Sequence, residues 1–91
     1  MAVSIRIPTP MRNLTGGASQ VTVEATTLAE ALKALDAAHP GVAERVLDES
    51  GALRRFVNVY VGDEDVRFLD GLETTLGDGA SVSIIPAVAG G

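Results

Sequence analysis

Residues 27–41 read TLAEALKALDAAHPG and contain a helix start, an apolar face and a helix stop. Thr27 and Glu30 have the spacing of a capping box, in which the threonine hydroxyl accepts from the Glu30 amide and the glutamate carboxylate reaches back. Four apolar residues then recur at helical spacing: Leu28, Ala31, Leu32 and Leu35. His39 precedes a proline, which disfavours helical geometry and ends the pattern. The segment therefore predicts one helix whose leucine face must be buried against another element.

Two alternating segments before this helix predict a β-hairpin. In residues 3–7 and again in residues 20–24, apolar side chains alternate with polar ones, the period-two pattern of a half-buried strand. Prolines follow the first segment directly. We therefore expect two paired strands joined by a long loop over residues 9–18, with Gly16-Gly17 as its turn.

Three further strands are predicted after the helix. A short helical turn at residues 42–47 comes first, and residues 56–61 then carry the strongest strand pattern in the chain. Residues 65–68 read as a short returning strand, residues 69–76 as irregular structure and residues 81–85 as the last strand. One main helix that buries its leucine face on one side of a sheet makes a two-layer α+β fold.

The composition indicates one small domain and excludes several functions. Ninety-one residues, 46% of them hydrophobic, can bury a modest core. No cysteine is present, which excludes disulfides, thiolate metal ligands and a thiol nucleophile. No stretch approaches the ~18 apolar residues of a membrane span, and the amino terminus lacks the apolar block of a signal peptide. We therefore expect a cytoplasmic protein with no membrane partner.

The charged residues form no pattern typical of catalysis or of nucleic-acid binding. The net charge is −5, whereas binding to nucleic acid depends on Lys and Arg. The single histidine, His39, is expected at a helix carboxyl end, where the helix dipole favours a cation. Residues 63–65 form an acidic cluster that reads as a solvated turn, since a calcium loop needs further spaced ligands. We expect a substrate or carrier for other enzymes, with no nucleic-acid partner, rather than an enzyme.

The chain ends in PAVAGG, residues 86–91, directly after the last predicted strand. Six extended residues reach roughly 20 Å, and glycine passes where no other residue fits because it has no Cβ. We therefore divide the chain into a domain of residues 1–85 and a flexible tail of residues 86–91. Such a tail can carry the terminal carboxylate into another protein's active site. A frayed terminus is the structural alternative.

The residues before and within this tail carry a resemblance to a known family. The pattern DGxxVxIIPxVAGG, residues 78–91, is similar to the ending of the MoaD/ThiS family of prokaryotic sulfur carriers. Residues 55–58 and 63–68 resemble that family's actinobacterial cysteine-biosynthesis branch, and the likeness spans essentially the whole chain. It implies the β-grasp fold of ubiquitin-like proteins, a mixed sheet of four to five strands packed on one main helix.

The resemblance also implies a function in which the tail is the reactive part. A partner enzyme would adenylate the terminal carboxylate with ATP, and a sulfur nucleophile would then form a thiocarboxylate. Gly91 would carry that group, while the carrier itself would bind no cofactor or metal. The residues expected to thread the tail are Gly90, Ala89, Val88, Ala87 and Pro86. Ile85, Phe68 and Val66 are expected to dock the partner, with ordinary core packing as the alternative for each.

Three classes of partner follow from this expectation. They are an E1-like adenylating enzyme of the MoeB/ThiF type, a sulfur-donor protein or sulfide source, and a sulfur-acceptor enzyme of the cysteine synthase or thiosugar synthase type. Two other functions use the same sequence features. The chain would be a ubiquitin-like modifier if Gly91 were joined to lysines, or an interaction module if the tail were incidental.

Overall fold

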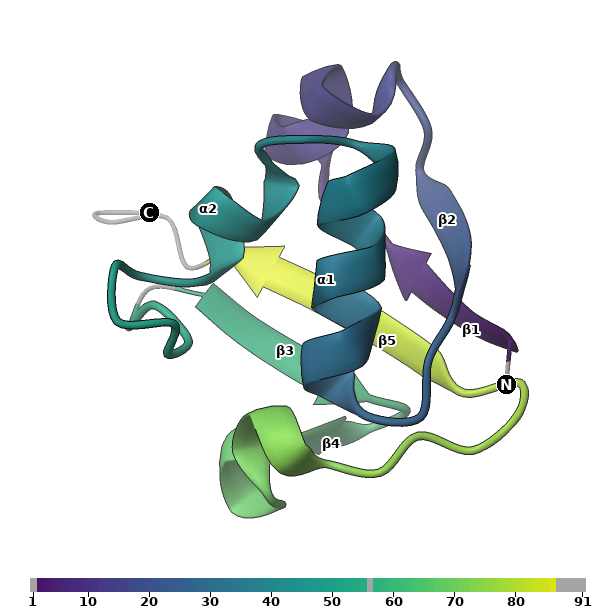
Figure 1. Ribbon diagram of the computed structural model, residues 1–91, viewed down its shortest axis with the longest axis vertical. Helices are drawn as coiled ribbons and strands as arrows, with labels where there is room; N and C mark the ends of the chain where they lie inside the picture. Colours follow the sequence, from purple (N-terminus) through teal and green to yellow (C-terminus); the bar gives the residue numbers. More distant parts are fainter. Residues whose placement is uncertain (1, 56, 87–91) are drawn as a thin grey trace.

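Helix α1 (Leu28–Ala38) lies across one face of a mixed sheet, as Figure 1 shows. The structure is a computed structural model that describes residues 2–55 and 57–86. The sheet contains β1 (Ala2–Arg6), β2 (Gln20–Glu24), β3 (Val57–Val61), β4 (Glu64–Asp65) and β5 (Ser81–Pro86). Short helices connect the layers: α2 (Val42–Val46) and the 3₁₀ helices η1 (Thr9–Thr15), η2 (Val66–Phe68) and η3 (Gly71–Glu73). The expected two-layer α+β architecture is confirmed.

The last strand occupies the centre of the sheet. The strand order is β2-β1-β5-β3-β4, so β5 lies between β1 and β3. It pairs in parallel with β1 and antiparallel with β3, whereas β1 and β2 form the predicted antiparallel hairpin. The β1 pairing covers residues 81–83 of β5, whereas the β3 pairing continues to Pro86, so the carboxyl end of β5 is held on its β3 side.

The predicted capping box forms, with its carboxylate displaced by one residue. The Thr27 hydroxyl accepts from the Glu30 amide at 3.3 Å. The Glu30 carboxylate accepts from both the backbone amide and the hydroxyl of Thr26, at 2.9 and 2.6 Å. These bonds satisfy donors that the first helical turn leaves without partners. At the other end the helix stops at Ala38, with His39 as its cap, as the proline at position 40 predicts.

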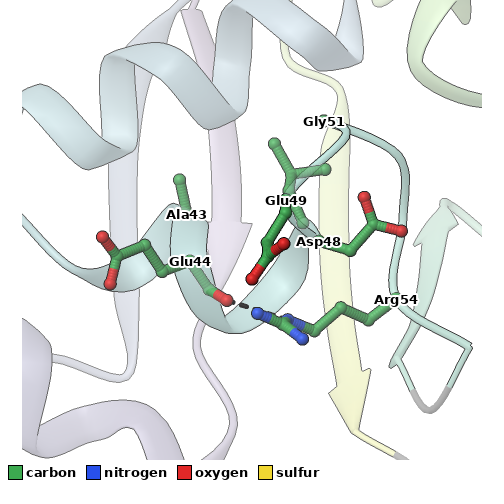
Figure 2. A pocket seen from close by; sticks show the side chains of 7 residues that line it. Ala43, Glu44, Asp48, Glu49, Gly51 and Arg54 are labelled. Carbon is green, nitrogen blue, oxygen red and sulfur yellow. Dashed lines mark hydrogen bonds between the residues drawn. The ribbon is translucent and has the colours of Figure 1, made fainter.

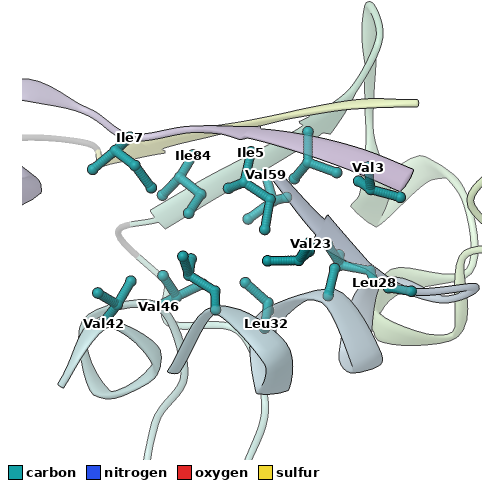
Figure 3. Close-up of a cluster of buried hydrophobic side chains, with 14 of the residues drawn as sticks. Val3, Ile5, Ile7, Val23, Leu28, Leu32, Val42, Val46, Val59 and Ile84 are labelled. Carbon is teal, nitrogen blue, oxygen red and sulfur yellow. The ribbon is translucent and has the colours of Figure 1, made fainter. Parts of the chain in front are cut away.

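The leucine face of α1 packs against the inward side chains of the central strands. Leu28 and Leu32 point toward the sheet in Figure 3, and residues of β1, β3 and β5 point back toward them. The buried set on the sheet side includes Val3, Ile5, Val59, Val82 and Ile84. Full burial of one such aliphatic side chain is worth about 1.5–3 kcal/mol. This packing explains why the alternating pattern of each strand presents one consistent face.

Two segments differ from the sequence-based expectation. Residues 65–68 were predicted to be a strand, but β4 ends at Asp65 and η2 begins at Val66. The Asp65 carboxylate accepts from the Arg67 amide at 2.9 Å, so it caps a helical turn and the strand stops. The predicted loop over residues 9–18 contains η1, whose first turn includes a bond from the Met11 amide to the Pro8 carbonyl at 2.9 Å.

Candidate functional site

The candidate site lies where β5 ends at the centre of the sheet. Pro86, the last described residue, pairs with Val57 of β3. The strand therefore extends one residue beyond the predicted domain boundary, and Pro86 belongs to β5 instead of opening the tail. The residues expected to carry the thiocarboxylate and to thread the tail lie outside the described residues: Gly91, Gly90, Ala89, Val88 and Ala87. What the structure describes is the surface from which this segment begins.

Ile85 is the exposed apolar residue at this end of the strand. Its neighbour Ile84 points into the core, whereas Ile85 faces outward and leaves 46% of its surface exposed. Its partner across the β3–β5 pairing is Asn58, which is partly exposed. Another surface can cover a half-exposed isoleucine without unfolding the strand, so the docking role of Ile85 stays a prediction.

Arg67 connects η2 to this part of the sheet. Its guanidinium donates to the side-chain oxygen of Asn58 at 2.5 Å and to the backbone carbonyls of Val57 and Arg54, each at 2.8 Å. The planar fork of an arginine can satisfy several acceptors at once. Sequence reasoning missed this residue, since the contacts exist only because η2 folds back over the start of β3.

The two other residues expected to dock a partner have opposite placements. Phe68 is 87% exposed, and Leu69 beside it is 39% exposed, so both are accessible. Val66 is 0% exposed and belongs to the core cluster. The expectation that Val66 lies on the docking surface was wrong: η2 turns its first side chain inward and its third outward. The core-packing alternative is the correct one for Val66.

A shallow hollow lies beside the end of β5, on the β1 side. Its volume is about 310 Å³, and its walls come from the end of β1, the start of η1 and the end of β5. Ile85 and Pro86 form part of it, together with Pro8. Arg6 and Arg12 also line it, and the Arg12 Nε donates to the Ile7 carbonyl at 3.1 Å. Apolar residues and the two arginines therefore line a hollow adjacent to the point where the tail begins.

A second hollow, of about 470 Å³, lies between α2 and the loop that follows it. Figure 2 shows Arg54 there, with its Nε donating to the Glu44 carbonyl at 2.8 Å. The Asp48 carboxylate accepts from the Ser50 amide and hydroxyl and from the Ala52 amide, which lowers the pKa of Asp48. Because these bonds build a turn, this carboxylate serves the loop and is not free for catalysis.

Two carboxyl groups of the described residues, Glu30 and Asp48, have lowered pKa values, and both have structural roles. The pKa of Glu30 is lowered by its hydrogen bonds to Thr26, which belong to the helix cap. No cluster of three His, Asp or Glu residues suited to a metal ion occurs within residues 2–55 and 57–86. Across the same residues no helix is long and apolar enough to cross a bilayer.

Comparison with known proteins identifies the family. The model of the ThiS family matches residues 5–91. The chain belongs to the ThiS family, as its terminal motif predicted. It is 50% identical, over 93 aligned positions that cover 100% of both chains, to the sulfur carrier protein CysO of Mycobacterium tuberculosis. This identity supports a sulfur-carrier role, the class of function expected from the tail.

The likeness to solved structures confirms the β-grasp fold. A chain of the BexX/CysO complex of Amycolatopsis orientalis superposes with a TM-score of 0.92 at 45% identity, covering 98% of this chain and 99% of that one. Another relative points to a different use of the same fold. Small archaeal modifier protein 3 of Haloferax volcanii is 42% identical over 65 residues, covering 71% of this chain and 70% of its own.

Proposed function

We propose that this protein carries sulfur as a thiocarboxylate at Gly91 and donates it to a biosynthetic enzyme. The observation that carries the proposal is the 50% sequence identity with CysO over the full length of both chains. In addition, the sequence continues from the central strand β5 to Gly90-Gly91. A rigid strand sets the direction of the tail, and narrow glycines allow its end to enter another protein. The carrier itself performs no catalysis in this proposal.

The chemistry proceeds in two displacements on the partner enzyme. A carboxylate oxygen of Gly91 attacks the α-phosphorus of ATP, forming an acyl adenylate and releasing pyrophosphate. Hydrosulfide then attacks the acyl carbon, and AMP leaves with the bridging oxygen and the bonding electron pair. The proton goes to solvent and the product is the thiocarboxylate anion. The net change is one oxygen replaced by sulfur, with ATP cleaved to AMP and pyrophosphate.

The partners in this proposal supply every catalytic group. An E1-like enzyme of the MoeB/ThiF type binds ATP and activates Gly91, and a sulfur-donor protein or sulfide supplies sulfur. The acceptor is an enzyme of the cysteine synthase or thiosugar synthase type.

The BexX/CysO complex of A. orientalis, formed by a similar chain, favours a stable complex between carrier and partner. We place these reactions in the cytoplasm, where ATP is available.

Ile85 and Phe68 are the apolar residues that we propose for docking these partners. Both are exposed in the free domain, at 46% and 87% respectively. Val66 is left out because its side chain is buried. Covering exposed apolar surface contributes to association without any change in the core.

Intact-mass measurement tests the proposal directly. The protein is incubated with a purified MoeB/ThiF-type enzyme, ATP and sulfide, and we expect the mass increase for one oxygen replaced by sulfur. Fragmentation should place the sulfur on Gly91. Omitting ATP, or appending one alanine after Gly91, should abolish the increase. If an enzyme that loads its own carrier left this protein unmodified, the proposal would be wrong.

The alternative is a ubiquitin-like modifier joined to lysines through Gly91. The match to small archaeal modifier protein 3 of H. volcanii favours this second function. The same activated carboxyl group serves both, because an amine can displace AMP as sulfide does. Blotting of lysates distinguishes the two: discrete higher bands that disappear on deletion of Gly90-Gly91 favour the modifier, and their absence favours the carrier.

A further inference from the structure

Three of the seven Lys and Arg residues of this acidic chain lie near the point where the tail begins. Lys and Arg number seven against twelve Asp and Glu. Arg6 lies at the end of β1, opposite Ser83 of β5, and lines the hollow beside Ile85 together with Arg12. On the other side of β5, Arg67 is bound to Asn58, the cross-strand partner of Ile85. Three arginines therefore flank the last two described residues from both sides.

These arginines keep their positive charge available to a partner. Arg12 donates to a backbone carbonyl, and Arg67 donates to two backbone carbonyls and one amide oxygen, all of them neutral acceptors. Such bonds hold the guanidinium in place without cancelling its charge. Arg6 is exposed to solvent, and its strand neighbours Gln20 and Ser83 are uncharged.

Three acidic residues near the sheet lie at its opposite end, whereas Asp65 caps η2 beside Arg67. Asp63 and Glu64 belong to the β3–β4 turn, and the amide of Gly62 in that turn donates to the Ser81 carbonyl at the start of β5. Asp78, just before β5, accepts from the Ala2 amide at 3.0 Å. The six residues of β5 span about 20 Å, whereas the Debye length at physiological salt is about 8 Å. Asp63, Glu64 and Asp78 are therefore screened from the three arginines near the tail.

The length of the tail decides what these arginines can reach. Five residues follow Pro86, and they can extend at most about 18 Å. When the tail is extended in a partner's active site, the arginines stay near its opening, far from the nucleotide at Gly91. Their contacts must then be made with protein groups around that opening.

We infer that Arg6, Arg12 and Arg67 form a basic collar that docks a protein partner bearing carboxylates around the mouth of its tail-binding channel. The inference rests on the proposed function, because it assumes that the tail enters a partner. The apolar surface of Ile85 and Pro86 lies within the collar. Burial of this surface stabilises the complex, while the arginine charges speed its formation. Rim charges of this kind act mainly on the association rate and on its dependence on salt.

A matched pair of charge reversals tests the collar. Arg6→Glu reverses one collar charge, while Lys33→Glu makes the same change in net charge at an exposed position on α1, the opposite layer. Association with the purified MoeB/ThiF-type enzyme is followed by stopped flow over increasing NaCl. We expect Arg6→Glu to slow association about fivefold or more at low salt, and Lys33→Glu to change it by less than about twofold. Arg6→Lys should keep most of the rate.

The outcomes separate the collar from the function it serves. Equal rates for Arg6→Glu and Lys33→Glu, in variants with wild-type circular dichroism, would overturn the collar even if the wild-type protein is loaded with sulfur. A collar-dependent rate without sulfur loading would overturn the proposed function instead. If Arg6→Glu abolished binding to a single-stranded oligonucleotide but left protein association unchanged, the collar would belong to nucleic acid and the inference would be wrong.

Discussion

Arg67 donates a hydrogen bond to the side-chain oxygen of Asn58 and thereby attaches η2 to β3, the strand that pairs with the end of β5. Asn58 pairs with Ile85 across the sheet, so the arginine lies one strand away from the residue expected to dock a partner. The two residues join a short helix at the sheet edge to β3, the neighbour of the central strand β5. This relationship places Phe68, the exposed end of η2, on a segment held to that strand.

Replacing Arg67 should destabilise the domain although the residue is exposed. Arg67→Ala removes bonds to Asn58 and to two backbone carbonyls, and we expect a loss of about 1–2 kcal/mol in the free energy of unfolding. Arg67→Lys should recover only part of this, since an ammonium cannot reproduce the planar fork. Urea unfolding measures the difference, with Arg45→Ala on exposed α2 as control. A loss no larger than that of the control would contradict the structural role.

Val66 and Phe68 should respond in opposite ways to truncation. Val66→Ala removes two fully buried methyl groups, so we expect a loss of about 1.5–3 kcal/mol in unfolding free energy. Phe68→Ser should change stability by less than about 0.5 kcal/mol, because its side chain is 87% exposed. In binding to the adenylating enzyme the order should reverse, with Phe68→Ser weakening the complex. Unchanged affinity for Phe68→Ser would remove Phe68 from the docking surface.

Glu30 should make the free energy of unfolding depend on pH in the acidic range. Its bonds to Thr26 lower its pKa in the folded state below the ordinary value of 4.5. Because the pKa of Glu30 is lower in the folded than in the unfolded protein, its ionised carboxylate stabilises the fold fully at pH values above the unfolded-state pKa. This stabilisation disappears as the pH falls through the folded-state pKa. We therefore expect Glu30→Gln to be less stable than wild type above pH 4.5, with the difference shrinking below it.

Urea unfolding at a series of pH values checks this expectation. Glu49→Gln, in the loop after α2, serves as the control carboxylate. If the difference between wild type and Glu30→Gln stayed constant down to the lowest pH at which both fold, the cap would not depend on the charge of Glu30.

Leu32 should dominate the packing of α1 against the sheet. Its side chain is 1% exposed within the core cluster, so Leu32→Ala should lower the unfolding free energy by about 2–5 kcal/mol through lost burial and the cavity left behind. Lys33→Ala, the next residue on the exposed face, should leave stability nearly unchanged. Thermal and urea unfolding give both values, and similar losses for the two variants would contradict the packing described here.

The sequence predicted the elements whose signals are local. The threonine cap, the leucine spacing and the proline stop located α1 to within a residue at each end, because each acts over one or two helical turns. Alternation located β1, β2 and β5 for the same reason, since a half-buried strand repeats every two residues. The segment 65–68 was assigned wrongly, because a side-chain cap at Asp65 competes with strand pairing and alternation does not reveal it.

The sequence by itself determined the helix, the alternating strands and the family motif, and it predicts a reactive end at Gly91. Tertiary structure alone decided that β5 lies between β1 and β3, that Val66 is buried while Phe68 is exposed, and that Arg6 and Arg67 flank the same strand end. The physical reason is the distance along the chain over which each interaction acts. Periodicity and capping are set by neighbours a few residues apart, whereas strand order and side-chain burial depend on contacts between residues distant in the chain.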